Sequence, residues 1–284
     1  MKRHASCDGL THPRGFVLVL TLAMILIAVM ITARSANRSL TRTLQAIESE
    51  TQLQSRWSKL SLQRSLLSRS TQVFEAVEAE ERASSSRRIW HDGQIELSGT
   101  TYRLRLSDEN AKVNLNTIRR TRPARDYQRF IAETVSVPRR PTMQEKTSLE
   151  RGPEINDTIE SWGLVFEDTS PAQLMDQTTS ITCWGNGRLN LQRASDQSVH
   201  IMLEPIIGQS DVDAILRQRH EQTDRHGHSP QMPQPSLVPP VAAELVTQDS
   251  RCYSLWLISE ESGDAELHVR EVRDHGSVES SFRW

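Results

Sequence analysis

Hydrophobic residues are concentrated near the start of the chain and recur at helical spacing after it. Residues 16–33 form a run of eighteen residues without a charge, Gly or Pro. That length is near the lower limit of the roughly 17 to 25 apolar residues that a helix needs to cross a bilayer. No Gly or Pro occurs between Gly15 and Gly93, so this stretch lacks the strongest helix breakers. We therefore predict a transmembrane segment at 16–33 that continues as a polar helix.

The polar continuation has apolar residues at intervals of three, four and seven from Leu40 to Val77. This is the period of a helix with one buried stripe. We expect the helix to reach about residue 82, with a bend in its polar half left open. A dimeric coiled coil is the alternative, and the irregular stripe between Ile47 and Trp57 disfavours it.

Two later segments alternate apolar and polar residues, which is typical of strands in an antiparallel sheet. The first covers residues 89–117, with turns at Gly93 and Gly99, and the second covers residues 246–284, with a turn around Gly263. The residues expected on one face of these strands are Tyr102, Leu104 and Leu106, with Arg103 and Arg105 opposite, and then Tyr253, Leu255 and Leu257, followed by Leu267, Val269 and Val272.

The region between the strands has mainly helical patterns. Residues 118–186 are basic and rich in proline in their first half, and Ser170 caps a helix opened by Pro171 in the second. The expected buried positions there are Ile155, Ile159, Trp162 and Leu174. We predict an inserted, mainly α-helical subdomain.

A short motif occurs twice. Residues 111–117 are echoed by residues 187–193, with Asn114 and Asn190 in equivalent places and Asn116 two residues after the first of them. Asn in such turns bonds to nearby backbone and caps the following helix, so we predict an architectural role for all three. Two short helices follow around Gly208, with these inward positions: Val199, Met202, Leu203, Val212, Ile215 and Leu216.

Together the patterns predict an α+β fold, in which a long N-terminal transmembrane and spine helix packs on an antiparallel sheet that carries the α-helical insert. The expected segments are a leader at 1–15, a transmembrane segment at 16–33, the rest of the spine helix at 34–88, first strands at 89–117, the insert at 118–186, the Asn motif and two-helix segment at 187–228, a solvated Pro-rich linker at 229–245 and closing strands at 246–284.

Charge and cysteine content narrow the function. The formal net charge of −2 argues against non-specific binding to nucleic acid. If the chain beyond the leader is exported, Cys183 and Cys252 are the only pair that could form a disulfide, and two buried thiols are the alternative. Four basic residues near the second motif are expected at the solvated surface: Arg188, Arg193, Arg217 and Arg219.

Other kinds of site have weaker support. The two helices around Gly208 look like a helix-hairpin-helix, which holds DNA phosphates at a Gly turn, but Asp211 and Asp213 would repel a phosphate. The histidines of this region, His220, His226 and His228, lack a hydrophobic shell that would orient them for zinc. No set of side chains with the pattern of a catalytic site occurs, so we expect no enzyme activity.

The start of the chain resembles a type IV prepilin. A short basic segment ends in Arg14 and Gly15, and Phe16 opens the apolar run. In that class a dedicated prepilin peptidase cuts after the Gly and the new N-terminal Phe is methylated, which implies cleavage between Gly15 and Phe16. Major subunits of the class carry Glu at the fifth mature position, where this chain has Leu20. A subunit with nothing above it needs no such carboxylate, so Leu20 points to the tip of a fibre.

The order of motifs along the chain resembles the general secretion pathway protein K family, the minor pseudopilins of the type II secretion system. The resemblance rests on the prepilin start, on residues 108–117 (DENAKVNLNT) and on residues 187–199 (GRLNLQRASDQSV), with helices between them. It implies a single-pass inner-membrane protein with most of the chain in the periplasm. The implied partners are the other minor pseudopilins, the major pseudopilin, the prepilin peptidase and the inner-membrane secretion platform. A minor subunit of a type IV pilus and a membrane-anchored helix-hairpin-helix DNA-binding protein are the alternatives.

Calcium binding is known for that family, and four carboxylates of the insert could supply oxygen ligands: Asp157, Glu160, Glu167 and Asp168. The sequence spells out nothing like a calcium-ligand loop in this region. We therefore predict no cofactor, with calcium as the alternative.

Overall fold

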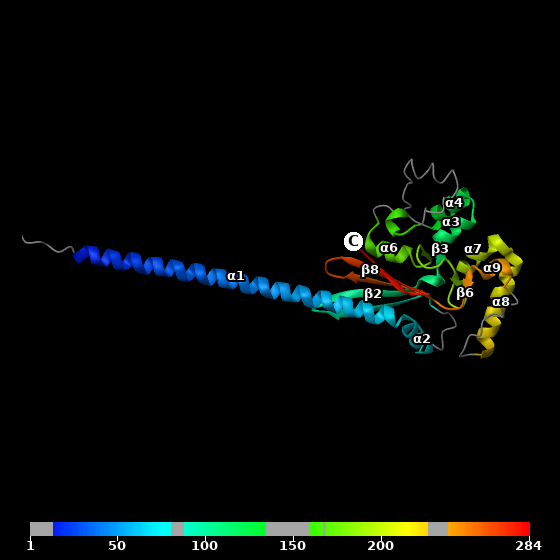
Figure 1. The fold of residues 1–284 in the computed structure, drawn as a ribbon, viewed down its shortest axis with the longest axis horizontal. Coiled ribbons are helices and arrows are strands. Elements are labelled where there is room, and N and C mark those ends of the chain that lie inside the picture. Colours follow the sequence, from blue (N-terminus) through cyan, green and yellow to red (C-terminus); the bar gives the residue numbers. More distant parts are fainter. Residues whose placement is uncertain (1–13, 81–87, 135–158, 167–168, 227–237) are drawn as a thin grey trace, which may run out of the picture. The chain divides into compact units, whose positions relative to one another are not determined.

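A computed structural model describes residues 14–80, 88–134, 159–166, 169–226 and 238–284 (Figure 1). The fold is α+β, and the chain divides into two compact units, Met1–Trp57 and Ser58–Trp284. The helical elements are α1 (Arg14–Ser68), α2 (Ser70–Glu80), η1 (Glu109–Ala111), α3 (Leu115–Thr121), α4 (Ala124–Thr134), η2 (Trp162–Leu164), α6 (Pro171–Gln177), α7 (Asp196–Ile207), α8 (Gln209–His226) and α9 (Pro240–Ala243). The strands are β1 (Trp90–Leu97), β2 (Thr100–Asp108), β3 (Val113–Asn114), β4 (Ile181–Thr182), β5 (Leu189–Asn190), β6 (Val246–Thr247), β7 (Cys252–Ser259), β8 (Ala265–Arg273) and β9 (Gly276–Arg283).

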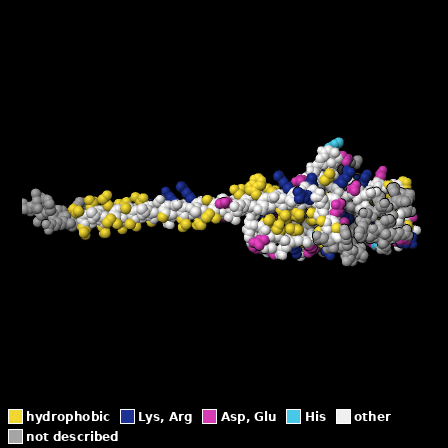
Figure 2. Space-filling view, turned by 90° about the horizontal axis from the view of Figure 1, so that it is seen from below, with side chains coloured by type: hydrophobic (Ala, Val, Ile, Leu, Met, Phe, Trp, Pro, Cys, Tyr) yellow, Lys and Arg dark blue, Asp and Glu magenta, His cyan; other side chains and the backbone are white. Residues whose placement is uncertain are grey.

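The described part of the first unit is a single helix, the N-terminal portion of α1. Its apolar side chains, including Leu20, Leu40 and Trp57, are all more than half exposed or close to it (Figure 2). Val17–Ser68 is the one helix among the described residues that is long and apolar enough to cross a membrane. This is consistent with a single membrane anchor or a signal segment.

The spine helix is interrupted once, at Arg69 between α1 and α2. The hydroxyls of Ser68 and Ser70 bond back to the carbonyls of Ser65 and Leu67 at 3.2 Å each. Serines that bond to backbone carbonyls of the preceding turn bend helices. The absence of Gly and Pro therefore did not ensure one continuous helix to residue 82, because a serine pair interrupts it.

The main sheet has five antiparallel strands in the order β1-β2-β7-β8-β9. Its central strand, β7, is buried along its whole length. Side chains of β7 alternate between two separate clusters, because successive residues of a strand point to opposite faces. Tyr253, Leu255 and Leu257 join the cluster on one face, and Cys252, Trp256 and Ile258 join the other.

One face of the sheet packs on the end of α1 and on α2. We call it the helix face. Its buried apolar residues are Leu67, Phe74, Leu106, Tyr253, Leu255 and Leu257, with Leu62, Leu66, Val73 and Leu104 packed at the margin. The predicted α+β architecture, with an N-terminal helix on an antiparallel sheet, is therefore confirmed.

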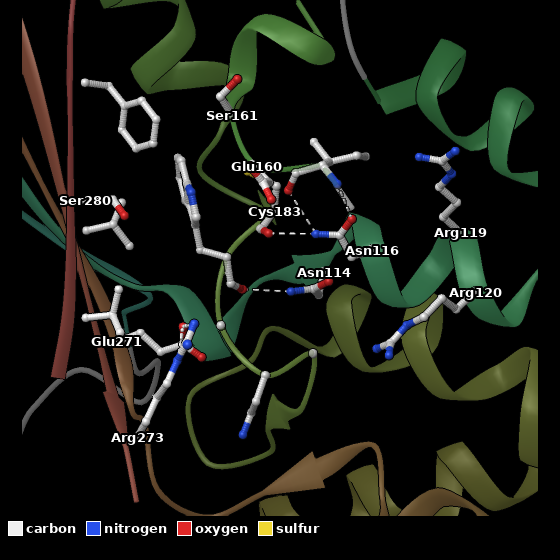
Figure 3. A pocket seen from close by; sticks show the side chains of 18 of the residues that line it. Asn114, Asn116, Arg119, Arg120, Glu160, Ser161, Cys183, Glu271, Arg273 and Ser280 are labelled. Carbon is white, nitrogen blue, oxygen red and sulfur yellow. Dashed lines mark hydrogen bonds and ion pairs between the residues drawn. The ribbon is translucent and has the colours of Figure 1, made fainter. Parts of the chain in front are cut away.

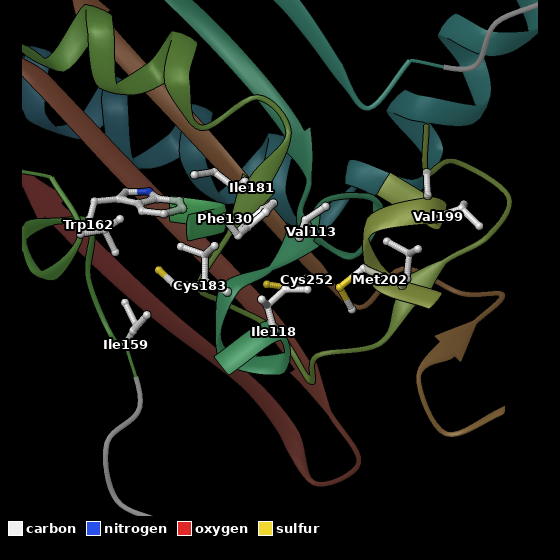
Figure 4. Packing of buried hydrophobic residues seen from close by; sticks show 14 of the residues in the cluster. Val113, Ile118, Phe130, Ile159, Trp162, Ile181, Cys183, Val199, Met202 and Cys252 are labelled. Atoms are coloured by element: carbon white, nitrogen blue, oxygen red, sulfur yellow. The ribbon is translucent and has the colours of Figure 1, made fainter. Parts of the chain in front are cut away.

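The opposite face, which we call the insert face, carries the main core (Figure 4). Strand residues such as Trp256, Leu267 and Val269 meet residues from α3, α4, α6, α7 and α8 there. The predicted buried positions Ile159, Trp162, Leu174, Val199, Met202, Leu203, Val212, Ile215 and Leu216 all belong to this core, whereas Ile155 lies outside the described residues. The predicted cap is also present, since Ser170 and Gln173 form a capping box at α6.

One expectation from the strand pattern is corrected. Val272 is exposed. It is three residues after the buried Val269, so its side chain points to the other face of β8 from those of Leu267 and Val269. Arg105 points away from Leu104 and Leu106 as expected, but α6 covers it: its guanidinium bonds to Asp92, Asp176 and the carbonyl of Met175.

The Pro-rich region at 229–245 is not solvated throughout. Residues 229–237 lie outside the description, but residues 238–245 are folded and contain α9. Val238 and Ala242 are buried in the main core, and Val246 pairs with β5 directly after this segment. Proline opens this short helix, because the first turn needs no N–H from that residue.

Candidate functional site

The predicted processing site lies in the first turn of α1. Gly15 and Phe16 fall within the helix, and their side chains are outside the described set. At the fifth position from Phe16, Leu20 is half exposed. The next residue, Thr21, donates its hydroxyl to the carbonyl of Leu18 at 2.9 Å. This turn of the helix thus presents no carboxylate.

The repeated sequence motif has a repeated structure. Val113 and Asn114 form the two-residue strand β3, which pairs in parallel with β4, and Leu189 and Asn190 form β5, which pairs in parallel with β6. In both copies the Asn side chain then accepts a bond from the following turn. Asn114 accepts from the N–H of Thr117 at 3.0 Å, and Asn190 accepts from the N–H of Gln192 at 2.9 Å.

The amide groups of the first motif join the two parts of the insert. Asn114 donates to the carbonyl of Trp184 at 2.8 Å. Asn116 donates to the carbonyls of Ile159 and Cys183 and accepts from the N–H of Ile159 at 2.8 Å. Backbone groups that would otherwise be left without partners are satisfied in this way.

A buried group of charges lies just before the first motif. Glu109 and Lys112 form an ion pair of 2.7 Å, and their side chains are 0% and 2% exposed. Glu109 also accepts from the hydroxyl of Ser254 in β7 at 2.5 Å. Removing one member of such a pair leaves an uncompensated buried charge, which is strongly destabilising. This pair therefore fixes η1 against the central strand.

Asp108 is the other acid of this group and is fully buried. It accepts bonds from the hydroxyl of Ser250 and from the N–H of Asn110. Burial raises the pKa of Asp108 to about 6, although these bonds and the charge of Arg193 oppose the shift.

Arg193 connects the second motif to α2. Its guanidinium lies 3.0 Å from Glu78, 3.6 Å from Asp108 and 4.7 Å from the ring centroid of Phe74. The prediction of a solvated Arg193 is therefore wrong, because only 10% of its side chain is exposed. Arg219 is also largely covered and bonds to Asp196 and to the carbonyls of Leu191 and Ala194.

Cys183 and Cys252 are free thiols, both buried in the main core (Figure 4). Burial raises the pKa of each thiol well above its ordinary value, which disfavours the reactive thiolate. In this structure both cysteines are therefore buried, unreactive thiols.

A groove of about 1220 Å³ lies next to the Asn motif (Figure 3). One wall is formed by Arg119, Arg120 and the loop that contains Trp184, and the opposite wall by β8 and β9. The rings of Trp184 and Phe282 lie 5.8 Å apart within this lining. The groove could not be predicted from the sequence, because its walls come from four segments that lie far apart in the chain.

The other side chains considered as metal ligands do not come together as a site in the described part of the chain. No group of three or more metal-binding side chains occurs among those residues. Of the four carboxylates considered for calcium, only Glu160 is described, and it lines the groove. His220 lies 3.2 Å from Asp196, while His226 and His228 are outside the described side chains.

The turn between α7 and α8 is not arranged to hold a phosphate. The N–H of Gly208 donates to the carbonyl of Glu204 at 2.9 Å, so this amide is already used within the fold. His200 adds contacts with Glu204 and Asp213 at 3.3 and 3.6 Å, and these carboxylates would oppose an anion.

A comparison with families of known proteins and with curated protein sequences found no match. The architecture is therefore the main guide to function. A long N-terminal apolar helix that packs on an antiparallel sheet is a pilin-like arrangement. The fold suggests a protein similar to the type IV pilins and pseudopilins.

Proposed function

We propose that this protein is a minor pseudopilin at the tip of a type II secretion pseudopilus, where it acts through contacts with other subunits and not as an enzyme. In this role the leader is removed between Gly15 and Phe16, residues 16–33 stay in the inner membrane and the rest of the chain lies in the periplasm. The chain then assembles with other minor pseudopilins and the major pseudopilin on the inner-membrane secretion platform, and helps to drive protein export across the outer membrane.

The observation that carries the proposal is the exposed apolar surface of the first unit. The large apolar side chains from Val17 to Trp57 have no partner within the described chain. Leaving this much apolar area in water is unfavourable, at roughly 25 cal/mol for each Å². A bilayer around the first part and neighbouring helices around the second would remove that surface from water.

Two further features favour the tip over the shaft. Leu20 occupies the place where shaft subunits of the prepilin class carry Glu, and the adjacent Thr21 is bonded within its own helix. The insert also builds a large core on one face of the sheet, and a subunit at the end of a fibre can carry such a domain without blocking further growth.

The processing step is tested by mass spectrometry of the membrane-extracted protein. We expect a mature N-terminus at N-methyl-Phe16. Gly15→Leu should abolish cleavage, whereas the matched control Gly9→Leu, which changes another glycine of the leader, should be cleaved normally. An intact leader in the unmodified chain, or a cut after Ala33, would overturn the proposal.

The tip position is tested by isolating the mature protein with its neighbours under mild detergent extraction. We expect small pilin-like subunits to copurify, with one copy of this chain in each assembly. Fibres in which this chain repeats along the length would contradict a tip role while leaving the pilin-like assignment intact.

A further inference from the structure

We propose that the outer edge of β9 and the groove beside it bind an extended segment of another protein chain, which carries an acidic side chain and adds to the sheet as a sixth strand. The proposal concerns how a partner is recognised, and it does not depend on the secretion role proposed above.

The first observation is that β9 is a long, regular edge strand. It is the last strand in the sheet order and pairs with β8 without a bulge over Gly276–Arg283. Among the residues that the structure describes, nothing pairs with its other side. Natural proteins usually protect such edges, because a free strand edge is a template for pairing with another chain.

The hydrogen-bond pattern identifies which backbone groups face outward. Trp284 and Ala265 exchange both of their bonds, at 3.0 and 3.4 Å, so they form a hydrogen-bonded pair. Such pairs alternate with non-bonded pairs along an antiparallel ladder. The N–H and C=O groups that point away from β8 are therefore those of Ser277, Glu279, Ser281 and Arg283.

The second observation is the position of the groove. Val278, Ser280, Ser281 and Phe282 of β9 line it, and the side chains of the first, second and fourth of these lie on the insert face of the sheet. A strand added to β9 would place every second side chain on this face. The groove, at about 1220 Å³, is large enough to receive them.

The charges of the groove indicate the chemistry of the incoming segment. Glu271 is paired with Arg273 at 2.8 Å on the β8 side. Across the groove, Arg120 is exposed (Figure 3), and its guanidinium donates one hydrogen bond among the described residues, to the hydroxyl of Thr117 at 3.4 Å. An acidic side chain from the added strand would find a positive partner there, which favours acidic over basic segments.

The pairing is tested by photo-crosslinking in cells that make the full-length protein. A photo-reactive phenylalanine analogue is placed at Ser277 or at Ser281, and the crosslinked partner residues are identified by mass spectrometry. A partner strand should be contacted at two residues four positions apart, because four residues of strand span about 13 Å. A helix covers that distance in about nine residues. The control position is Glu96, an exposed residue of the opposite edge strand β1.

The charge requirement is tested in the same cells. Arg120→Glu should lower the crosslinking yield from Ser281 by about fivefold or more, because it opposes an acidic side chain. Arg125→Glu makes the same charge change at an exposed position of α4 outside the groove and should leave the yield unchanged. Ser281→Pro removes an outward N–H without touching the ladder to β8 and should abolish crosslinking from Ser277.

The proposal is overturned if Ser277 and Ser281 crosslink no better than Glu96, or if the partner residues are spaced as in a helix. It is also overturned if the crosslinked segment contains no Asp or Glu, or if it is β9 of a second copy of this chain. The two proposals can fail separately. If the leader is retained but the crosslinked residues are four positions apart, the secretion role is refuted and the strand addition is supported.

Discussion

The two faces of the central sheet are covered in different ways. On the helix face, six buried apolar residues pack between the sheet and the spine helices, and ion pairs such as Lys59 with Glu266 supplement the contact. On the insert face, a much larger core joins segments from Val113 to Val269. The helix face therefore buries few apolar side chains, whereas the insert face carries the main hydrophobic core. We infer that the core on the insert face contributes most of the stability of the second unit, although a pilin-like helix and sheet do not require this core.

The largest expected effect comes from the insert face. Trp256 is 1% exposed in the main core. Trp256→Ala should lower the free energy of unfolding by about 4 to 5 kcal/mol, which is the upper part of the range for truncating a buried aromatic side chain to Ala. Urea unfolding of the detergent-solubilised chain, followed by circular dichroism, measures this. The control Trp57→Ala removes an exposed ring and should change stability by less than about 0.5 kcal/mol. Equal effects would refute the distinction between the two sites.

A somewhat smaller and more local effect is expected on the helix face. Phe74→Ala should cost about 3 kcal/mol, because it empties a fully buried position and removes the ring beneath Arg193. The loss should appear first as faster proteolysis within α2 while the insert stays protected. Glu75→Ala, at the exposed neighbouring position, serves as the control. Simultaneous cleavage of the insert would show that the two faces unfold as one unit.

Asp108 should make stability depend on pH. Its folded pKa of about 6 lies above the ordinary value of 3.8, so the folded state binds more protons between these values. Stability from this group therefore rises as pH falls from about 6 to about 4, by on the order of 3 kcal/mol. Asp108→Asn should remove this rise, and the difference between the two unfolding curves at pH 4 and pH 7 measures it. Parallel curves would contradict a strongly shifted Asp108.

The smallest effect should come from the ion pair at the edge of the helix face. Contact with His268 and the charges of Lys59 and Arg283 lower the pKa of Glu266 to about 2. This contribution is present above the ordinary pKa of 4.5 and is lost as pH falls toward 2. Because the pair of Lys59 and Glu266 is partly open to solvent, Lys59→Ala should cost less than about 1 kcal/mol at pH 7. A thermal shift as large as that of Phe74→Ala would refute this ranking.

The helix face could largely be predicted from the sequence, and the insert face could not be predicted to the same extent. The period of two residues marked Leu255 and Leu257 as inward positions, and the period of 3.6 residues predicted a buried stripe on the spine helix, because each period depends only on local geometry. The helical pattern of the two-helix segment at 187–228 also marked positions such as Val199 and Ile215. Their partners were not predictable, since nothing in a periodic pattern says which distant segment completes the core.

The polar junction was partly visible in the sequence. The repeated motif drew attention to Asn114 and Asn190, but not to the buried charges of Asp108, Glu109 and Arg193. Acidic residues next to Lys112 look like an ordinary solvated turn, and only the three-dimensional fold brings Ser250 and Ser254 to them. The groove could not be predicted for the same reason, because Arg120 and Ser280 line the same groove only in the folded chain.

The pairing of β2 with β7 also determines the order in which the second unit can fold. Asp108 of β2 lies beside Tyr253 of β7, and the bond between Glu109 and Ser254 joins positions 145 residues apart. Contacts this distant in sequence close large loops and slow folding. During synthesis and export, the β2 edge of the hairpin of β1 and β2 therefore stays unpaired until β7, near the end of the chain, has emerged. We expect this interval, more than any weakness of the finished fold, to make the chain dependent on chaperones.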